Sequence, residues 1–210
     1  MTVSVALRSR LVDGLADLDL PASESQVNQL LAFLVLLQKW NRTYNLTAIR
    51  DLESGVDLHL LDSLAVLPYL RGRRILDVGT GGGLPGIPLA LMSEGREFVL
   101  LDSSGKKIRF VQQAVMELGL ANVEAVATRI EDYHPSQLFD VIVTRAFASL
   151  EMIQSLTRRL LAPGGVILAL KSRMAEQEMA GMTEHTGIHV HRLVIPGVDA
   201  ERSLIELTGI

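Results

Sequence analysis

Cysteine is absent from this sequence, and its absence excludes several kinds of chemistry at once. A disulfide framework, a thiolate nucleophile and a zinc–thiolate site all require cysteine sulfur. His59 and Asp62 have the spacing of one helix face, but two such residues do not make a metal site. We therefore expect no metal, and we interpret His59 and Asp62 as packed polar residues with satisfied hydrogen bonds.

The sequence also lacks a long apolar run. The longest such run in its first third, Leu30 to Leu37, is far shorter than the ~20 residues that a membrane span needs. Residues 1–10 contain arginines but are not followed by the continuous apolar stretch of a signal peptide. We expect a cytoplasmic protein without a membrane partner.

An excess of positive charge is missing as well. Lysine and arginine number 20 against 24 aspartate and glutamate residues, which gives a net charge of −4. This balance argues against a nucleic-acid substrate without excluding one, because a local basic patch can bind RNA on an acidic protein. With 210 residues, of which 48% are hydrophobic and 21% charged, the chain suffices for one well-cored domain plus an appendage.

The first 70 residues have a helical pattern. Ser23 and Gln26 form a capping-box pair at the start of a long helix. After them, apolar residues recur at helical spacing, at Val27, Leu30, Leu31, Leu34, Leu37 and Trp40. Two further short helices are expected over residues 52–61 and 63–70, and no strand pattern precedes Arg73. These residues predict a helical N-terminal extension, residues 1–70.

From Arg73 onward, apolar strands alternate with helices. The expected strands are 75–78, 98–102, 123–127, 139–143 and 166–170, with helices at 88–92, 106–118 and 150–161. Residues 188–195 and 203–207 alternate like a final antiparallel hairpin. Strands separated by helices predict a doubly wound, Rossmann-like α/β sheet over residues 71–210, mostly parallel and forming one compact unit with the extension.

A glycine-rich loop, Asp77 to Gly86, directly follows the first of these strands. Glycines allow a tight turn and close approach of a ligand, and the carboxyl end of the first strand is where a nucleotide-like ligand binds in such a sheet. Gly81, Gly83 and Gly86 also have the dinucleotide spacing, so the loop alone leaves the cofactor open. A turn without any ligand is the structural alternative.

Two acidic residues accompany the loop. Asp102 ends the second strand, where a carboxylate can accept hydrogen bonds from both ribose hydroxyls of NAD or S-adenosylmethionine; alternatively it caps the helix that begins near Gly105. Ile130 and Glu131 follow the third strand, where an adenine amino group and an apolar wall are expected, although Glu131 is equally readable as a solvated loop acid.

Asp77 distinguishes the two cofactors. A carboxylate at this position attracts the amino group and sulfonium of S-adenosylmethionine, whereas dinucleotide sites keep the position apolar because pyrophosphate is anionic. Pro85 stands where a helix N-terminus would offer amides to a pyrophosphate, and no Tyr-x-x-x-Lys pair is present. The sequence therefore predicts an S-adenosylmethionine-dependent methyltransferase, with an NAD-binding oxidoreductase as the weaker alternative.

With these residues in place, the chain resembles the bacterial small-subunit rRNA guanine-N7 methyltransferase family, called RsmG or GidB. The resemblance covers most of residues 36–171. It is carried by Trp40-Asn41-Arg42-Thr43-Tyr44-Asn45-Leu46-Thr47, His59-Leu60-Leu61-Asp62-Ser63, residues 77–88, residues 100–107 and Val143-Thr144-Arg145-Ala146-Phe147-Ala148-Ser149-Leu150. Generic methyltransferases share only the glycine loop and the acidic strand end.

The resemblance implies a class I methyltransferase sheet and a target that is a single guanosine N7 in 16S rRNA, free or within the 30S subunit or a precursor. It also implies cofactor contacts at Gly79, Leu84, Ile130, Glu131 and Arg145. Together with the residues argued above, the expected S-adenosylmethionine set is Asp77, Gly79, Gly81, Leu84, Asp102, Ile130, Glu131 and Arg145. A small-molecule methyltransferase and a non-catalytic RNA-binding module are further alternatives, and we expect a monomer.

Guanine N7 already carries an in-plane lone pair, so methyl transfer to it needs no general base and depends on alignment and water exclusion. Arg145 is the expected positioning residue for substrate or cofactor, the alternative being an arginine that pins its adjacent loop through a salt bridge. The expected RNA contacts are Arg42, Asn45, Lys106, Lys107 and Lys171, with Arg173 as a further candidate.

Other candidates for RNA contact are weaker. Arg71, Arg73 and Arg74 precede the first strand and belong to the opposite edge of the sheet, so we discount them. Trp40 and Tyr44 can stack on a flipped-out base, but we favour packing of this helix onto the sheet, with Asn45 holding a loop.

Overall fold

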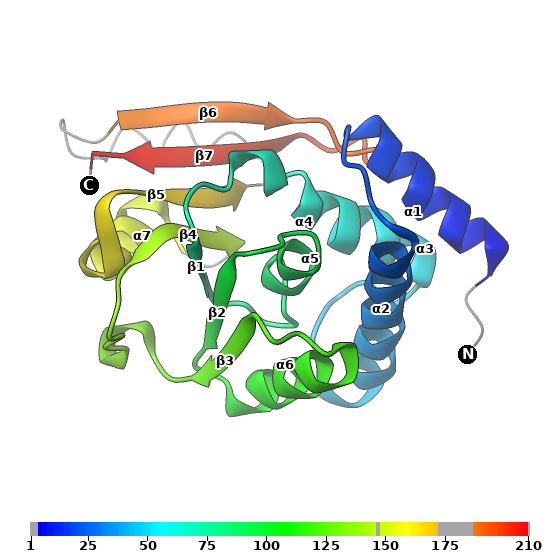
Figure 1. The fold of residues 1–210 in the computed structure, drawn as a ribbon, viewed down its shortest axis with the longest axis horizontal. Helices are drawn as coiled ribbons and strands as arrows, with labels where there is room; N and C mark the ends of the chain where they lie inside the picture. Colours follow the sequence, from blue (N-terminus) through cyan, green and yellow to red (C-terminus); the bar gives the residue numbers. More distant parts are fainter. Residues whose placement is uncertain (1–3, 146–147, 172–186, 210) are drawn as a thin grey trace.

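A seven-stranded mixed sheet forms the centre of the computed structural model, which describes residues 4–145, 148–171 and 187–209. The strand order is β3-β2-β1-β4-β5-β7-β6 (Figure 1). The strands are β1 (Arg74–Val78), β2 (Glu97–Asp102), β3 (Val123–Ala127), β4 (Phe139–Arg145), β5 (Leu161–Lys171), β6 (Gly187–Leu193) and β7 (Arg202–Thr208). The first five are parallel, and β7 is antiparallel to both β5 and β6.

The predicted C-terminal hairpin is confirmed, because β6 and β7 pair from Gly187–Thr208 to Leu193–Arg202. Its placement was not predicted: β7, the later strand, lies between β5 and β6. Burial explains this order. Residues 203–207 of β7 are all buried, whereas most of β6 is partly or fully exposed, so β6 is the strand suited to the sheet edge.

Both faces of the sheet are covered, as the doubly wound prediction requires. Alternate strand residues enter two separate apolar clusters, as side chains on a strand point to opposite faces. The first cluster includes α5 (Gly86–Leu91), α6 (Gly105–Leu118) and the N-terminal helices. The second is smaller and includes α7 (Leu150–Thr157) with the 3-10 turns η3 (Ile130–Asp132) and η4 (Arg158–Leu160).

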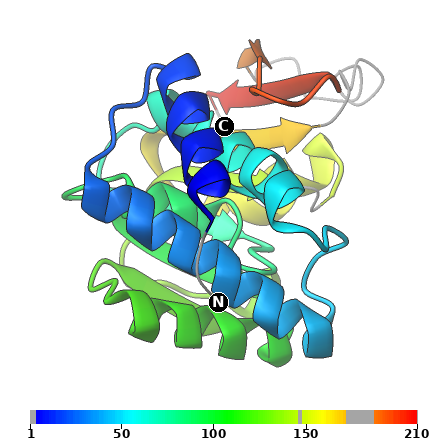
Figure 2. The ribbon, with the colours of Figure 1, turned by 90° about the vertical axis from the view of Figure 1, so that its right-hand side faces the viewer.

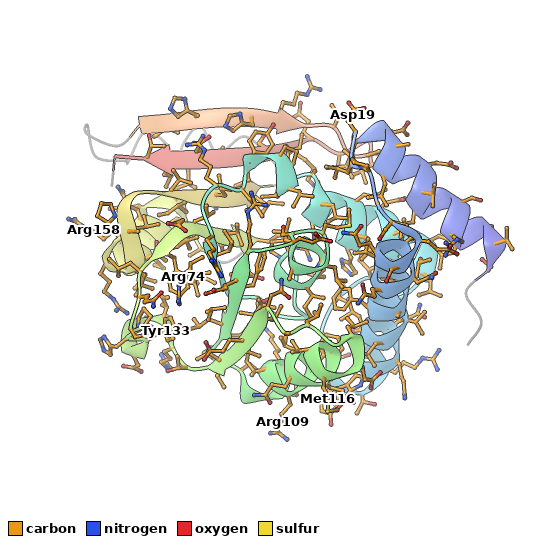
Figure 3. All side chains as sticks on the ribbon, viewed as in Figure 1. Asp19, Arg74, Arg109, Met116, Tyr133 and Arg158 are labelled. Atoms are coloured by element: carbon orange, nitrogen blue, oxygen red, sulfur yellow. The ribbon has the colours of Figure 1, made fainter. Side chains whose placement is uncertain are left out.

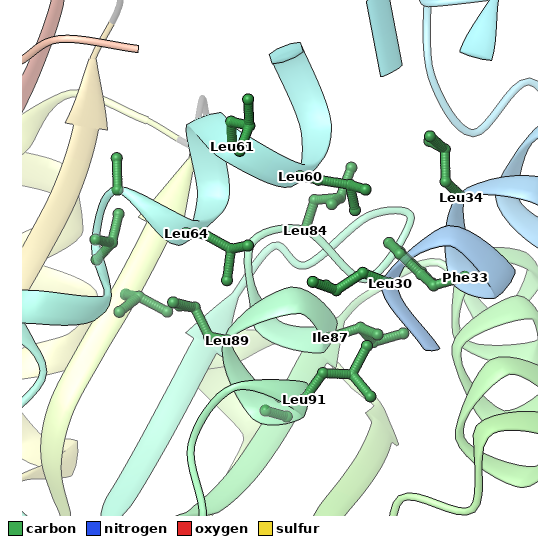
Figure 4. Close-up of a cluster of buried hydrophobic side chains, with 14 of the residues drawn as sticks. Leu30, Phe33, Leu34, Leu60, Leu61, Leu64, Leu84, Ile87, Leu89 and Leu91 are labelled. Carbon is green, nitrogen blue, oxygen red and sulfur yellow. The ribbon is translucent and has the colours of Figure 1, made fainter. Parts of the chain in front are cut away.

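The N-terminal helices form an outer layer over α5 and α6. The helix α1 (Val5–Asp17) precedes α2 (Glu24–Tyr44), which runs alongside α6 (Figure 2) and contacts α5 as well. The capping box is confirmed: Gln26 N donates to Ser23 Oγ at 3.2 Å, and Ser23 N donates to Gln26 Oε1 at 2.9 Å. Figure 4 shows Leu30 and Phe33 of α2 lying beside Ile87 of α5 in this core.

The two short helices expected over residues 52–61 and 63–70 were wrong in their boundaries. One helical segment runs through α3 (Leu52–Gly55), a π-helical stretch η1 (Val56–Leu61) and α4 (Asp62–Leu64), followed by a 3-10 turn η2 (Leu67–Tyr69). The chain does not break at residue 62 because that residue keeps helical dihedrals and donates its N–H to Asp57 O across the wide turn. Such π stretches occur frequently at functional sites.

Other predicted ends are close to the observed ones. Gly119 ends α6 with a left-handed φ of 66°, as expected. The last predicted helix is shorter than expected, because α7 ends at Thr157 and continues as the turn η4. The strand β4 is longer, so Arg145 is its last residue and pairs with Leu170 instead of lying past the strand. Within the described residues, no helix combines the length and apolarity of a membrane span.

Candidate functional site

The glycine loop turns directly after β1 and is held by its own side chains and by β2. Gly81 has a left-handed φ of 58°, and its N–H donates to Asp102 Oδ2 at 3.0 Å. A Cβ at Gly86 would lie 2.6 Å from Asp77 Oδ2 and 2.8 Å from Leu100 Cγ, so only glycine fits there. The loop is therefore shaped by a bond to β2 and by close packing over Asp77.

Asp77 is fully buried beneath this loop. Its Oδ2 accepts hydrogen bonds from Thr80 Oγ1 at 2.6 Å and from Gly86 N at 2.9 Å, while Oδ1 has no partner among the described residues. Burial raises the pKa of the Asp77 carboxyl to about 6, against the lowering effect of those two bonds. Asp77 thus braces the loop with one oxygen, and only Oδ1 is left to accept from a further group.

Asp102 has a different set of bonds from the helix cap considered as its alternative. Its Oδ1 accepts from Ser104 N at 2.8 Å, and its Oδ2 faces Gly81 N and, at 3.5 Å, Lys107 Nζ. Ser104 occupies the N-cap position of α6, and Asp102 accepts none of the first-turn N–H bonds given for that helix. The carboxylate of Asp102 therefore ties the start of α6 to the glycine loop.

Asp102 also lines a cavity of about 360 Å³, here called the first cavity, at the carboxyl ends of β1, β2 and β3. Its lining residues are Gly79, Leu101, Asp102, Ser103, Lys107, Thr128, Arg129, Ile130 and Glu131. This volume lies in the range of small-molecule sites, and this edge is where ligands bind in open α/β sheets. The predicted residues Gly79, Asp102, Ile130 and Glu131 therefore come together here.

Other predicted cofactor residues do not line the first cavity. The side chain of Leu84 is 5% exposed and belongs to the helical core, beside Leu60 (Figure 4), and its N–H donates to Thr80 O at 2.9 Å, so only its carbonyl is left for a ligand. Gly81 directs its N–H to Asp102. The lining residues Thr128 and Arg129 were missed, although their position directly after β3 is the signal that could have identified them.

Arg145 lines a separate space, the second cavity, of about 370 Å³. Its lining residues are Ile49, Leu58, Asp62, Arg145, Leu170, Lys171 and Arg202, none of which lines the first cavity. Arg145 Nη1 donates to Leu58 O at 3.0 Å and to Asp62 Oδ2 at 3.2 Å. The salt-bridge alternative for Arg145 is thus present, directed at the helical segment 52–64 and not at the arginine's own loop.

Asp62 bridges two guanidinium groups at the second cavity. Besides Arg145, its carboxylate accepts from Arg202 Nε at 2.9 Å, and Asp62 itself is buried. Arg202 begins β7 beside the carboxyl end of β5, where Ser203 pairs with Lys171. Sequence reasoning missed Arg202, because only strand pairing brings it to this edge.

His59 is neutral in this environment. Burial lowers its pKa to about 4, and the nearby charge of Arg145 adds to the effect. Its Nε2 lies 2.9 Å from Thr47 Oγ1, and its Nδ1 lies 3.1 Å from Leu58 O. The hydrogen-bond partners of His59 are thus Thr47 and Leu58, whereas those of Asp62 are Arg145 and Arg202. In the described parts of the chain, no group of three or more His, Asp or Glu side chains is arranged to hold a metal ion.

The loop after α2 is held by Asn41, whereas we had suggested Asn45 for that role. Asn41 Oδ1 accepts from Thr47 N at 2.9 Å, and its Nδ2 donates to Ile49 O at 3.2 Å. Asn45 instead ends α2 with a left-handed φ of 51° and is exposed. The position of Asn41 on the buried face of α2 was the signal that could have revealed its role.

Trp40 and Tyr44 pack as we favoured, although their ring contacts are with each other and with α6 instead of with the sheet. Their rings stack with centroids 5.1 Å apart, and Trp40 lies 5.7 Å from Phe110 of α6. Lys106 Nζ lies 5.9 Å from the centre of the Tyr44 ring, so the exposed Arg42 and Asn45 and the first turn of α6 belong to one region.

The remaining basic candidates divide between the two cavities. Lys107 lines the first cavity beside Asp102, and its contact with RNA stays a prediction. Lys171 lines the second cavity and donates to Ala148 O at 2.7 Å. Arg71 and Arg73 lie at the amino end of β1, paired with Glu206 and Glu97, consistent with discounting them. Arg173 lies outside the described residues.

Comparison with known proteins gives one consistent result. Residues 26–205 match the model of the family GidB, described as rRNA small subunit methyltransferase G. A "Ribosomal RNA small subunit methyltransferase G" from Methylococcus capsulatus is 54% identical over 92% of this chain and 95% of its own length. Another with that name, from Legionella pneumophila, is 47% identical over 98% of this chain and 96% of its own length.

Solved structures of lower identity share the fold. An O-methyltransferase from Bacillus cereus, in complex with S-adenosylhomocysteine, has a TM-score of 0.61 at 18% identity and covers 97% of this chain and 100% of its own. The O-methyltransferase TomG from Streptomyces achromogenes, in complex with S-adenosylmethionine, has a TM-score of 0.60 at 18% identity and covers 100% of this chain and 99% of its own. At such identities the likeness concerns the architecture alone.

Proposed function

Because the chain belongs to the rRNA small subunit methyltransferase G family, we propose that it transfers a methyl group from S-adenosylmethionine to N7 of a single guanosine in 16S rRNA. The observation that carries the proposal is the first cavity, which gathers Gly79, Asp102, Ile130 and Glu131 at the ligand-binding edge of a methyltransferase-type sheet.

The polar and apolar groups of the first cavity fit S-adenosylmethionine. Asp102 offers a carboxylate to paired ribose hydroxyls, and Ile130 supplies an apolar wall for a purine beside the carboxylate of Glu131. Asp77 does not line the first cavity, but its Oδ1 is buried and unpartnered among the described residues, which supports a role as acceptor for the amino group of the cofactor. Gly79, Gly81 and Leu84 would contribute through their carbonyls, because their N–H groups already donate within the protein. When bound, S-adenosylmethionine supplies an activated methyl group on a positively charged sulfur.

Methyl transfer at guanine N7 needs no proton to leave first. The N7 lone pair forms the new bond to the methyl carbon while the carbon–sulfur bond breaks, its electron pair stays on sulfur, and the positive charge passes to the guanine ring. This chain's residues therefore act by holding the reacting atoms in line and by excluding water.

The second cavity is our proposed site for the target nucleotide. The described lining of the second cavity carries an excess of positive charge, because it contains one carboxylate, Asp62, and three basic side chains, Arg145, Lys171 and Arg202. A guanidinium fork can bind a phosphate or the O6 edge of guanine. We assign Arg145 the role of positioning the acceptor at the cofactor's methyl end, in place of the direct cofactor contact that the resemblance implied.

RNA outside the target nucleotide is proposed to contact Arg42, Asn45 and Lys106 at the junction of α2 and α6, together with Lys171. Lys107 lines the first cavity, and in this proposal it also contacts the RNA. We further propose that the N-terminal helices, residues 1–70, and residues 71–210 fold as one unit, and that the protein acts as a monomer on 16S rRNA, free or within a 30S particle.

The test is methyl transfer from labelled S-adenosylmethionine to 16S rRNA and to small subunits purified from a strain that lacks this protein, with the modified base mapped. Label on one guanine N7 is the expected result. Calorimetric binding of S-adenosylmethionine without label on RNA would contradict the RNA substrate and favour a small-molecule acceptor. Binding of NAD in place of S-adenosylmethionine would contradict the reaction itself.

A further inference from the structure

One arginine holds the backbone behind the first cavity. Arg159, in the turn η4, donates from Nη1 to Tyr133 O at 2.8 Å and from Nη2 to Glu131 O at 3.2 Å and to Ile130 O. Three carbonyls of the turn that follows β3 thus converge on a single guanidinium far away in the sequence. Among the described residues, no carboxylate pairs with Arg159.

The carbonyls bound by Arg159 belong to the wall of the first cavity. Ile130 and Glu131 line that cavity, whereas Arg159 is not among its lining residues, so the arginine supports the wall from behind. In a trans peptide the C=O and N–H point in opposite directions. Fixing Ile130 O on Arg159 therefore turns the N–H of Glu131 away from the arginine, and a 3-10 turn offers this N–H no internal partner because it lies in the first turn.

Ile130 is buried and the Tyr133 ring stacks on Phe139, so side chains hold the turn to the core, but few other hydrogen bonds fix the backbone of this turn. Its own backbone bonds are long, at 3.2 Å from Asp132 N to Arg129 O and 3.3 Å from Tyr133 N to Ile130 O. The preceding strand β3 is the edge of the sheet, and none of its five residues is fully buried. A planar guanidinium with five donors can hold several carbonyls in one arrangement, which a lysine ammonium cannot reproduce.

We propose that Arg159 is a positioning residue for the cofactor: it fixes the Ile130–Tyr133 turn so that the wall of the first cavity and the Glu131 N–H are preorganised for a purine ring. The inference rests on the proposed function, because it assumes that S-adenosylmethionine occupies the first cavity. Arg159 itself would touch neither cofactor nor RNA, so its effect belongs to cofactor binding and not to the transfer step.

The neighbouring Arg158 provides a matched control. It carries the same charge in the same turn and is exposed, and its side chain has no hydrogen bond to the described residues. Figure 3 shows Arg158 at the same end of the molecule as Tyr133, with its side chain directed outward. Replacing Arg158 therefore removes an equal charge without releasing the turn.

The experiment compares R159A, R159K and R158A with the wild type. We expect R159A to raise the Kd of S-adenosylmethionine, measured by calorimetry, and its KM by about tenfold, the loss corresponding to one charged hydrogen-bond set. The kcat at saturating cofactor, the KM for RNA and the thermal midpoint should stay close to those of R158A. R159K should fall between the two, since it keeps the charge but not the fork.

Three results would overturn the inference: an unchanged Kd in R159A, an equal change in R158A, or a fall in kcat with an unchanged KM. If R159A does not fold, the comparison of R159K with R158K decides in the same way. Wild-type protein that binds no S-adenosylmethionine would overturn the proposed function and this inference together, whereas equal binding by wild type and R159A would overturn this inference alone.

Discussion

The two cavities lie along one edge of the sheet, yet they are built in different ways. Four residues of the first cavity follow β3 directly, and three more follow one another at the end of β2. The second cavity combines the segment around Leu58 with Arg145, Lys171 and Arg202, residues that are widely separated in the sequence. The first cavity is thus a local product of strand ends, and the second is a product of tertiary assembly.

The two cavities also differ in the balance of charged side chains that line them. In the first cavity, Asp102 and Glu131 stand among basic neighbours, a mixture suited to a zwitterionic cofactor. In the second, Asp62 is outnumbered by Arg145, Lys171 and Arg202, a balance suited to an anionic polymer. If this division is right, substitutions on each side should affect one substrate and spare the other.

The largest effect should come from R145A. Removing the guanidinium leaves the acceptor misaligned, and we expect kcat/KM with RNA to fall by about a hundredfold. The Kd of S-adenosylmethionine should change less than twofold, because Arg145 does not line the first cavity. Single-turnover kinetics and calorimetry measure the two quantities. Wild-type turnover would refute the assignment, and lost cofactor binding would break the division between the cavities.

Acid should weaken the segment behind the second cavity through His59. Its folded pKa is lowered to about 4, so between about pH 6.5 and 4 the unfolded state binds more protons and the free energy of unfolding falls as the pH falls. The loss should reach about 3 kcal/mol by pH 4. Asp77 affects the free energy of unfolding with the opposite pH dependence, because its folded pKa is raised to about 6. Its stabilising contribution is present at low pH and is lost as the pH rises through 6.

Denaturant unfolding at several pH values checks this expectation. H59Q should flatten the acid side of the stability profile, and H134Q, at an exposed position, should leave the profile unchanged. Parallel profiles for wild type and H59Q would show that His59 is not the group that titrates.

A smaller effect should come from D102N on the cofactor side. The substitution removes the charge and the acceptor that holds Gly81 N, so we expect the Kd of S-adenosylmethionine to rise about tenfold. The KM for RNA should be unchanged, which makes D102N the mirror image of R145A. Equal losses in both substrates would mean that the cavities act as one site.

The smallest effect should come from K106A. If Lys106 contacts a phosphate, RNA affinity falls a few-fold and the slope of log K against log salt decreases by about one. R73A removes an equal charge at the opposite edge and should leave the slope unchanged. Identical salt slopes for K106A and wild type would move the RNA path away from the junction of α2 and α6.

The same contrast explains what the sequence could predict. Helix starts and stops depend on neighbouring residues, so the Ser23–Gln26 capping box and the Gly119 stop were predicted correctly. Most residues of the first cavity lie at or just after strand ends, and sequence reasoning located four of its nine lining residues, Gly79, Asp102, Ile130 and Glu131. Such local rules do not describe which distant segments meet.

Several misses involve long-range contacts: the position of β7 inside the sheet and the roles of Arg159 and Arg202 each depend on a partner far away in sequence or on competition between strands for burial. Other misses are local, because Thr128 and Arg129 directly follow β3, the π turn closes between residues 57 and 62, and Asn41 bonds to residues six and eight positions away. Arg145 is intermediate: its strand was predicted, but its partner Asp62 was interpreted only as a packing residue. A periodic pattern carries no information about such partners.

The insertion of β7 between β5 and β6 has a consequence for synthesis on the ribosome. Chains emerge from the N-terminus, and β1 to β5 can pair as soon as residue 171 is out. The strand β7 and Arg202 lie further along the chain, so the second cavity is completed only after they have emerged as well. A nascent chain of this protein can therefore assemble the first cavity while the second cavity still lacks Arg202.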